Sequence, residues 1–138
     1  MGKKTKFNEL KRVFERLHGP NGCMWDKKQT HKSLIPYLRE EADEFIHALR
    51  SGDYSHMKEE LGDILLQVMF HSQVASKARR FDVEDVIDSL IKKLKRRHPH
   101  IFGKTKVGSV NEIIVNWHKI KAAERKEKRK HPRLSRRR

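Results

Sequence analysis

Two acidic segments contain the side chains whose types and spacing suggest chemistry. The first contains Glu40, Glu41 and Glu44, and the second contains Glu60 and Asp63. Residues three or four positions apart lie on the same face of a helix. The first segment is therefore expected to project a pair of acids, Glu41 and Glu44, from one helix, and the second a pair from the next. Paired carboxylates of this kind are typical ligands of hard divalent cations.

A short turn is expected to bring these two helices together as an antiparallel hairpin. Only residues 51–53 separate the two helical patterns. On the first helix Glu41 lies about 60° and Glu44 about 120° from Leu38, so both acids border the apolar stripe. Four carboxylates beside such a seam repel one another, and a divalent cation removes that repulsion. A set of oxygen ligands favours Mg²⁺ or Mn²⁺ over zinc.

An acidic helix is also compatible with a purely structural role. Glu-rich helices often expose their acids to solvent and pair them with basic residues four positions away. Here Glu40 instead faces Glu44, and Glu41 faces Phe45. This pattern favours the metal site over a solvated face.

The rest of the chain is expected to be helical too. Apolar residues recur at spacings of three and four, and no strand-like alternation is found. The first helix is predicted to end at Gly19-Pro20, and residues 19–30 are interpreted as an ordered loop. We expect an all-α bundle built round the hairpin and completed by oligomerisation. The predicted helix starts are Thr30 or Ser33 (with Pro36 in the first turn), Asp53 or Ser55, Asp82 with Asp85, and Ser109 with Glu112. The predicted helix ends are Gly52, about Ala78 and Pro99.

Size and composition indicate one domain without disulfides. A chain of 138 residues suits one domain and is too short for two. The only cysteine, Cys23, cannot form an intrachain disulfide and fits a reducing compartment. No apolar run is long enough to span a membrane and no leader-like segment is found, so we expect a cytoplasmic protein.

Positive charge is concentrated at the end of the chain. The formal net charge is +15, and residues 121–138 alone contain ten Lys or Arg and two Glu. Such a segment is expected to be extended or frayed and attractive to polyanions. A solvated terminus and a nucleic-acid contact both explain it. We therefore expect a domain over 1–124 followed by a flexible basic tail over 125–138.

Beyond its acids, the chain resembles the MazG family of nucleoside triphosphate pyrophosphohydrolases. The E-E-x-x-E motif at 40–44 and the E-x-x-D motif at 60–63 match the family's metal-binding signature. Further matching blocks lie at 22–30, 60–68 and 96–103, and together they span most of residues 7–121. Met24 departs from the pattern, because the family loop usually has proline there, but no acid or base is lost.

The resemblance implies magnesium-dependent hydrolysis of nucleoside triphosphates to monophosphate and pyrophosphate, by attack of water at the α-phosphorus. Mg²⁺, with Mn²⁺ as a substitute, would be bound by Glu41, Glu44, Glu60 and Asp63. Glu40 would also belong to the catalytic acids. Both Glu40 and Glu59 would lie outside the four ligands or would contact water or a further ion. Family members assemble as dimers or tetramers. The residues implied to contact the nucleotide are Lys93, Arg96, Arg97, Trp117 and Lys121.

A second function class stays open beside this enzyme. The chain can also be interpreted as a helical nucleic-acid-associated protein that uses its basic tail, with the acids in structural roles. In that case Lys93, Arg96 and Arg97 are a plain basic face, and Trp117 is a core aromatic. The intact acidic set favours the enzyme, and the absence of a G-x-x-x-x-G-K-[ST] motif excludes a P-loop nucleotidase.

Overall fold

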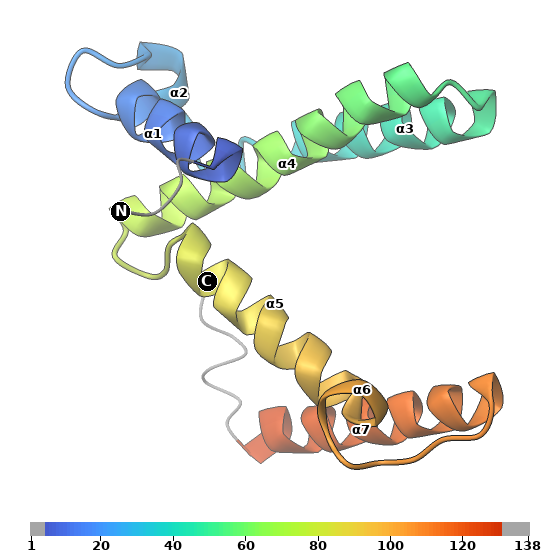
Figure 1. The fold of residues 1–138 in the computed structure, drawn as a ribbon. Helices are drawn as coiled ribbons and strands as arrows, with labels where there is room; N and C mark the ends of the chain where they lie inside the picture. The colour runs from blue at the N-terminus through green and yellow to red at the C-terminus, as the bar shows by residue number, and fades with distance from the viewer. Residues whose placement is uncertain (1–4, 131–138) are drawn as a thin grey trace. The chain divides into compact units, whose positions relative to one another are not determined.

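The computed structural model describes residues 5–130, and every regular element in that range is a helix (Figure 1). The all-α prediction is therefore confirmed. The described chain divides into two units, one ending at Val86 and the other beginning at Ile87. None of the described helices is both long and apolar enough to cross a membrane. The helices are α1 (Lys6–His18), α2 (Met24–Lys28), α3 (Ile35–Ser51), α4 (Tyr54–Lys77), α5 (Val83–Arg97), α6 (Pro99–Phe102) and α7 (Val110–Lys130).

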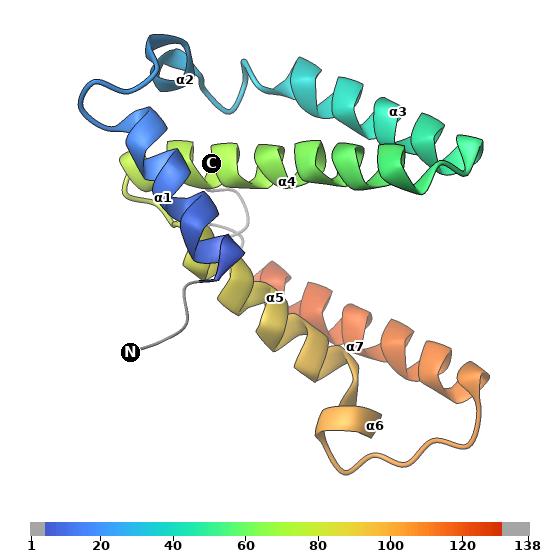
Figure 2. The same cartoon turned by 45° about the horizontal axis from the view of Figure 1, so that its top comes forward.

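The first unit is built on the predicted hairpin, in which α3 and α4 pack side by side in opposite directions (Figure 2). Gly52 ends α3 in the left-handed region with a φ of 74°, and its N–H donates to the Leu49 carbonyl at 3.3 Å. A glycine adopts this conformation without steric cost, which is why the turn can be so short. Asp53 then caps α4 by accepting hydrogen bonds from the N–H groups of Ser55 and His56. The predicted stop at Gly52 is confirmed, and of the two predicted starts, Asp53 and Ser55, the structure has Asp53.

A small apolar core holds the N-terminal segment against the hairpin. Phe14 of α1, Leu34 before α3, and Met69 and Phe70 of α4 are at least 95% buried. The Phe14 ring meets the Phe70 ring edge-on, with centroids 6.0 Å apart. Phe7, Leu10, Val74 and Val83 pack around these four residues.

Two predictions near the start of the hairpin are wrong. Residues 24–28 form the short helix α2 instead of a loop, because Trp25 packs edge-on against Tyr37 and Phe70 and anchors the turn. Neither Thr30 nor Ser33 caps α3, which begins one residue later at Ile35. Instead, each of the two side chains accepts the other's backbone N–H in the preceding turn, at 2.9 and 3.0 Å. Pro36 does lie in the first turn, as predicted.

The caps predicted for the later helices are largely confirmed. Asp82 and Asp85 accept each other's backbone N–H at the start of α5. Ser109 accepts the N–H of Glu112 at the start of α7, but the Glu112 carboxylate accepts from Gly108 and not from Ser109.

The end of the chain departs from the prediction in two ways. Pro99 follows the end of α5 as expected, but it also begins the one-turn helix α6. The basic segment was predicted to be extended or frayed, and the extended alternative is wrong for residues 121–130, which continue α7 to Lys130. Ala, Glu, Lys and Arg are strong helix formers, and this preference outweighs the mutual repulsion of the basic side chains. Residues 131–138 of the predicted tail lie outside the described residues, and the boundary at 124 stays a prediction.

Substitution of Phe14 by Ala is expected to destabilise the first unit by about 3–5 kcal/mol, because it opens a cavity beside Phe70. Urea unfolding followed by circular dichroism measures the loss. Tyr54→Ala is the control, since that side chain is 83% exposed and its removal should change the free energy of unfolding by under about 0.5 kcal/mol. Equal effects of the two substitutions would contradict the proposed core.

Candidate metal centre

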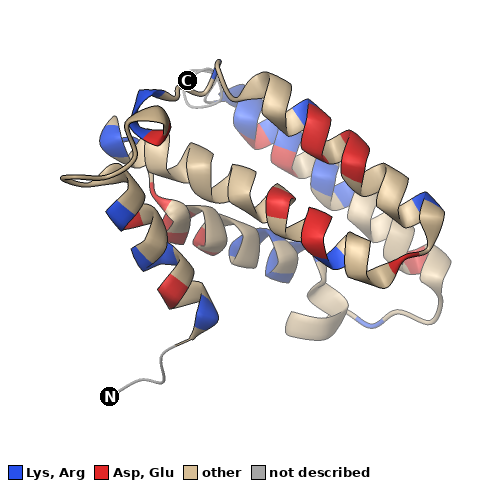
Figure 3. Ribbon diagram, turned by 90° about the horizontal axis from the view of Figure 1, so that it is seen from above, with Lys and Arg blue, Asp and Glu red and all other residues tan. Residues whose placement is uncertain are grey.

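The hairpin brings four carboxylates together where α3 and α4 face each other. Glu41 and Glu44 extend from α3, and Glu60 and Asp63 extend from α4. One ligand oxygen from each lies within 4.8 Å of all the others. Figure 3 shows the acidic positions of both helices along the same stretch of the hairpin. The convergence predicted from the three-residue spacing is therefore confirmed.

Two oxygens of this cluster are buried without a partner. Glu41 Oε2 and Glu60 Oε2 are inaccessible and accept no hydrogen bond from the described residues. The Glu60 residue as a whole is only 6% exposed, and its Oε1 lies 3.2 Å from His56 Nε2. Buried anionic oxygens without partners are costly, and a coordinated cation is one of the few groups that satisfies them. The residues present therefore fit a divalent cation.

The electrostatics of Glu41 support the same conclusion. Burial and the negative charges of Asp63, Glu44, Glu60 and Glu40, in that order, raise the pKa of Glu41 from 4.5 to about 7. Burial first, and the neighbouring negative charges second, therefore disfavour the ionised form of Glu41. The charge of a divalent cation opposes this effect.

Two neighbouring acids, Glu40 and Glu59, lie outside the cluster of four carboxylates. Glu40 and Glu59 are exposed and do not belong to the group of converging oxygens. A depression of about 430 Å³ opens beside the cluster, lined by Asp43, Glu44, His47, His56 and Glu60. Sequence analysis missed His56. Its position four residues before Glu60 places both side chains on the same face of α4.

The second unit contains the residues implied to contact the nucleotide. Arg97 lies with its guanidinium carbon 5.1 Å from the centre of the Trp117 ring. Lys93 and Arg96 line a hollow of about 680 Å³ between α5 and α7. Lys121 is half-buried on α7. The structure thus groups Arg97 with Trp117, and Lys93 with Arg96.

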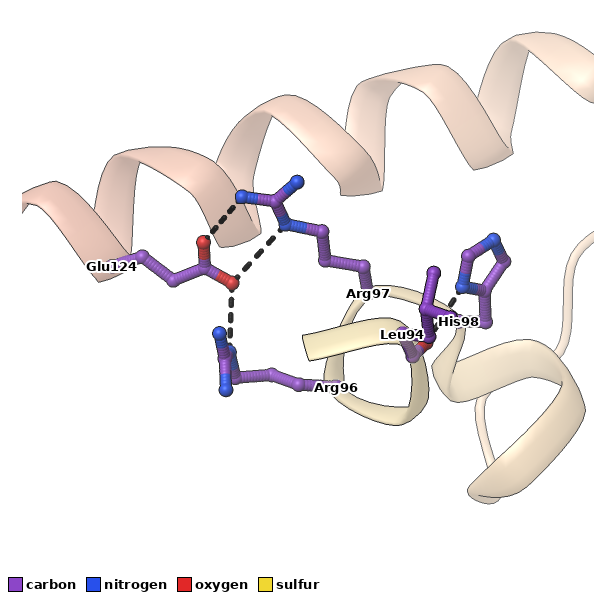
Figure 4. Close-up of polar contacts among 5 residues, drawn as sticks. All are labelled: Leu94, Arg96, Arg97, His98 and Glu124. Carbon is purple, nitrogen blue, oxygen red and sulfur yellow. Dashed lines mark hydrogen bonds and ion pairs between the residues drawn. The ribbon is translucent and has the colours of Figure 1, made fainter. Parts of the chain in front are cut away.

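An acid that sequence analysis did not identify joins these cations. Glu124 of α7 accepts hydrogen bonds from both Arg96 and Arg97 (Figure 4). No local pattern in the sequence signals this contact, because 27 and 28 positions separate the partners.

As a class, the chain is an all-helical protein whose hairpin carries a candidate centre for a divalent cation. The sequence model of the MazG nucleotide pyrophosphohydrolase domain matches residues 29–102. This match covers more than half of the chain. The chain therefore belongs to the MazG family.

Individual relatives agree with this assignment. The chain is 50% identical over 123 residues to the nucleoside triphosphate pyrophosphohydrolase/pyrophosphatase MazG of Thermotoga maritima, covering 89% of this chain and 47% of that protein. It is 38% identical over 131 residues to the nucleoside triphosphate pyrophosphohydrolase of Escherichia coli K12, covering 94% and 50%. It is 46% identical over 120 residues to the uncharacterized protein YabN of Bacillus subtilis, covering 87% and 24%. The chain thus spans half or less of the length of these relatives.

A solved structure shares the fold over most of both chains. The crystal structure of a mazG-related protein from Thermotoga maritima superposes with a TM-score of 0.67 and 26% sequence identity. The match covers 82% of this chain and 96% of that one.

The raised pKa of Glu41 predicts how stability depends on pH. Between pH 4.5 and about 7 the unfolded chain has lost the Glu41 proton while the folded chain keeps it. The contribution of Glu41 to the free energy of unfolding therefore falls as pH rises through this window and is constant above it. Glutamine does not titrate, so Glu41→Gln should lack this fall. In EDTA, the stability of the variant relative to wild type should therefore rise from pH 4.5 to about 7.

Urea unfolding at several pH values measures that difference. A second set of unfolding curves is measured in saturating Mg²⁺. There a bound cation should stabilise the wild type more than the variant at pH 7 and above. Parallel pH curves for the two proteins in EDTA would show that neither burial nor the neighbouring acids raise the pKa of Glu41.

Proposed function

We propose that this chain hydrolyses nucleoside triphosphates to nucleoside monophosphate and pyrophosphate. The convergence of four carboxylates with two buried, unpartnered oxygens is the observation that carries the proposal. The names of the Thermotoga and Escherichia relatives support the same substrate class.

We assign the cation as Mg²⁺, with Mn²⁺ as a substitute, held by Glu41, Glu44, Glu60 and Asp63. An all-carboxylate set without cysteine favours these hard cations. When bound, such an ion neutralises phosphate oxygens and lowers the pKa of coordinated water. Glu40 adds negative charge next to the four ligands and is assigned, with Glu59, to outer contacts with water or a further ion.

The reaction is a displacement at the α-phosphorus. The oxygen of a water molecule forms a bond to this phosphorus, and the bond to the oxygen that bridges the α- and β-phosphates breaks. Pyrophosphate leaves with that bonding pair, and the water's proton passes to solvent or a neighbouring carboxylate. Lys93, Arg96, Arg97 and Lys121 are assigned to the triphosphate, where positive charge stabilises the leaving group. Trp117 is assigned to the base or ribose.

We also propose that the chain works as a homodimer or homotetramer. Leu61, Leu65 and Val68 of α4 recur at helical spacing and remain 40–51% exposed in the single chain. A stripe of this kind supports burial against another copy. Contact of the basic C-terminal segment with nucleic acid, the alternative function, stays a prediction.

Loss of a single ligand is expected to abolish turnover. Glu41→Gln and Asp63→Asn should each lower the catalytic efficiency at least about 100-fold, because loss of an outer partner alone already costs about 10–100-fold at metal sites. Glu9→Gln on α1 is the control for removal of an exposed acid. Circular dichroism checks that helicity is retained. Near-normal turnover of either variant at saturating Mg²⁺ would refute the ligand assignment.

The position of bond cleavage is tested with isotopic water. Hydrolysis in oxygen-18 water should label the monophosphate and leave pyrophosphate unlabelled, because the new oxygen bonds to the α-phosphorus. Mass spectrometry of both products measures the label. Release of orthophosphate as the first product would identify a phosphatase instead.

A further inference from the structure

Two arginines at the end of α5 share one carboxylate of α7. Arg96 Nε donates to Glu124 Oε2 at 2.7 Å. Arg97 donates from Nη2 to Glu124 Oε1 at 2.8 Å and from Nε to Oε2 at 3.3 Å (Figure 4). The side chains of Glu124 and Arg97 are only 15% and 17% exposed, while that of Arg96 is 49% exposed. This is a largely buried ion cluster and not a loose surface pair.

The direction of these bonds determines which donors remain for a ligand. Glu124 uses the Nε edge of each guanidinium. Its contacts leave both Nη atoms of Arg96 and Nη1 of Arg97 to other acceptors, since an arginine has five N–H donors. Planar guanidinium groups with such donors suit the oxygens of phosphate.

Aromatic packing fixes Arg97 further. Its guanidinium lies over Trp117, and the His98 ring also packs edge-on against that indole, at a centroid distance of 5.3 Å. The His98 side chain is itself tied to the Leu94 carbonyl through Nδ1, at 2.6 Å. The arginine therefore has little freedom to reorient.

The charge of the cluster stays positive. Two guanidinium groups and one carboxylate leave one net positive charge, and Lys92, Lys93 and Lys128 line the adjacent hollow with Arg96. Hydrogen bonds from Arg97 and Arg96 lower the pKa of Glu124 to about 2 despite its burial. The carboxylate is therefore ionised at every pH at which the protein would act.

We propose that Glu124 is a positioning residue for phosphate recognition, which holds Arg96 and Arg97 by their inner edges so that their outer N–H groups face the triphosphate of the substrate. The proposal rests on the proposed function and names the acid that orders its cationic site. Donors held in place bind without losing side-chain freedom, which favours affinity.

The opposite role, in which Glu124 competes with phosphate for the arginines, makes the opposite prediction. Removal of a negative charge from a cationic site strengthens the binding of an anion when only charge matters. Removal of the residue that orders the donors weakens it. The sign of the change therefore separates the two roles.

The experiment measures the binding of inorganic tripolyphosphate by titration calorimetry, together with kcat and KM for nucleoside triphosphates. Glu124→Gln is expected to raise the Kd for tripolyphosphate about tenfold, which corresponds to about 1.4 kcal/mol. It should raise KM by a similar factor and change kcat less. The matched control is Glu127→Gln, one turn along α7, where the acid lines the same hollow but pairs with Lys130. This control loses the same charge and should change the Kd by less than about twofold.

A double-mutant cycle distinguishes positioning from a general structural role. In an Arg97→Gln background, Glu124→Gln should change the Kd less than in wild type, because one of the two arginines through which it acts is gone and only Arg96 remains. Full additivity, or binding as tight as wild type in Glu124→Gln, overturns the proposal. If Glu124→Gln does not fold, Glu124→Asp keeps the charge with a shorter reach, and its Kd should still exceed that of wild type.

The outcome separates this inference from the proposed function. Loss of tripolyphosphate affinity in Glu124→Gln without any nucleotide hydrolysis by the wild type would support the anion site and refute the enzyme. Normal hydrolysis with unchanged affinity and KM in Glu124→Gln would refute the positioning role alone.

Discussion

Electrostatic repulsion among the carboxylates between α3 and α4 is the constraint on which the first unit depends. Four ligand oxygens gathered within 4.8 Å oppose the packing of the two helices that bring them together. The rest of the unit must outweigh this repulsion. The turn at Gly52, the cap at Asp53 and the aromatic contacts of Phe14 and Phe70 supply stabilisation that opposes it.

The second unit shows the same principle with the charges reversed. Arg96 and Arg97 would repel each other at the end of α5, and Glu124 holds them together while leaving a positive balance. In each proposed site the described side chains leave part of the charge without a partner of opposite sign.

Local pattern predicted what depends on local spacing. The helical face shared by Glu60 and Asp63, the glycine stop at Gly52 and the aspartate cap at Asp53 all follow from positions close in sequence, and the structure contains each of them. Helix α2 was missed because its stability comes from Trp25 packing on residues far along the chain.

The C-terminal helix and Glu124 show two further limits. Residues 121–130 continue α7 because strong helix formers such as Ala122 and Ala123 outweigh the repulsion among the basic side chains, which net charge alone does not reveal. The role of Glu124 depends on how α7 packs against α5, which no single-helix pattern contains. The contact between His56 and Glu60, in contrast, depends only on local spacing, since four positions separate the two residues on α4.

Phe70 of the apolar core and the acids lie on the same side of α4, and this has a consequence for how the chain can vary in length. Glu60, Gln67 and Phe70 are all buried, at spacings of seven and three. Inserting or deleting one residue between Asp63 and Gln67 would rotate the acids by about 100° relative to the core, because each residue turns a helix by that angle. Substitutions on the outer face of α4 leave this register intact. In this segment the number of residues is therefore constrained more strictly than their identity.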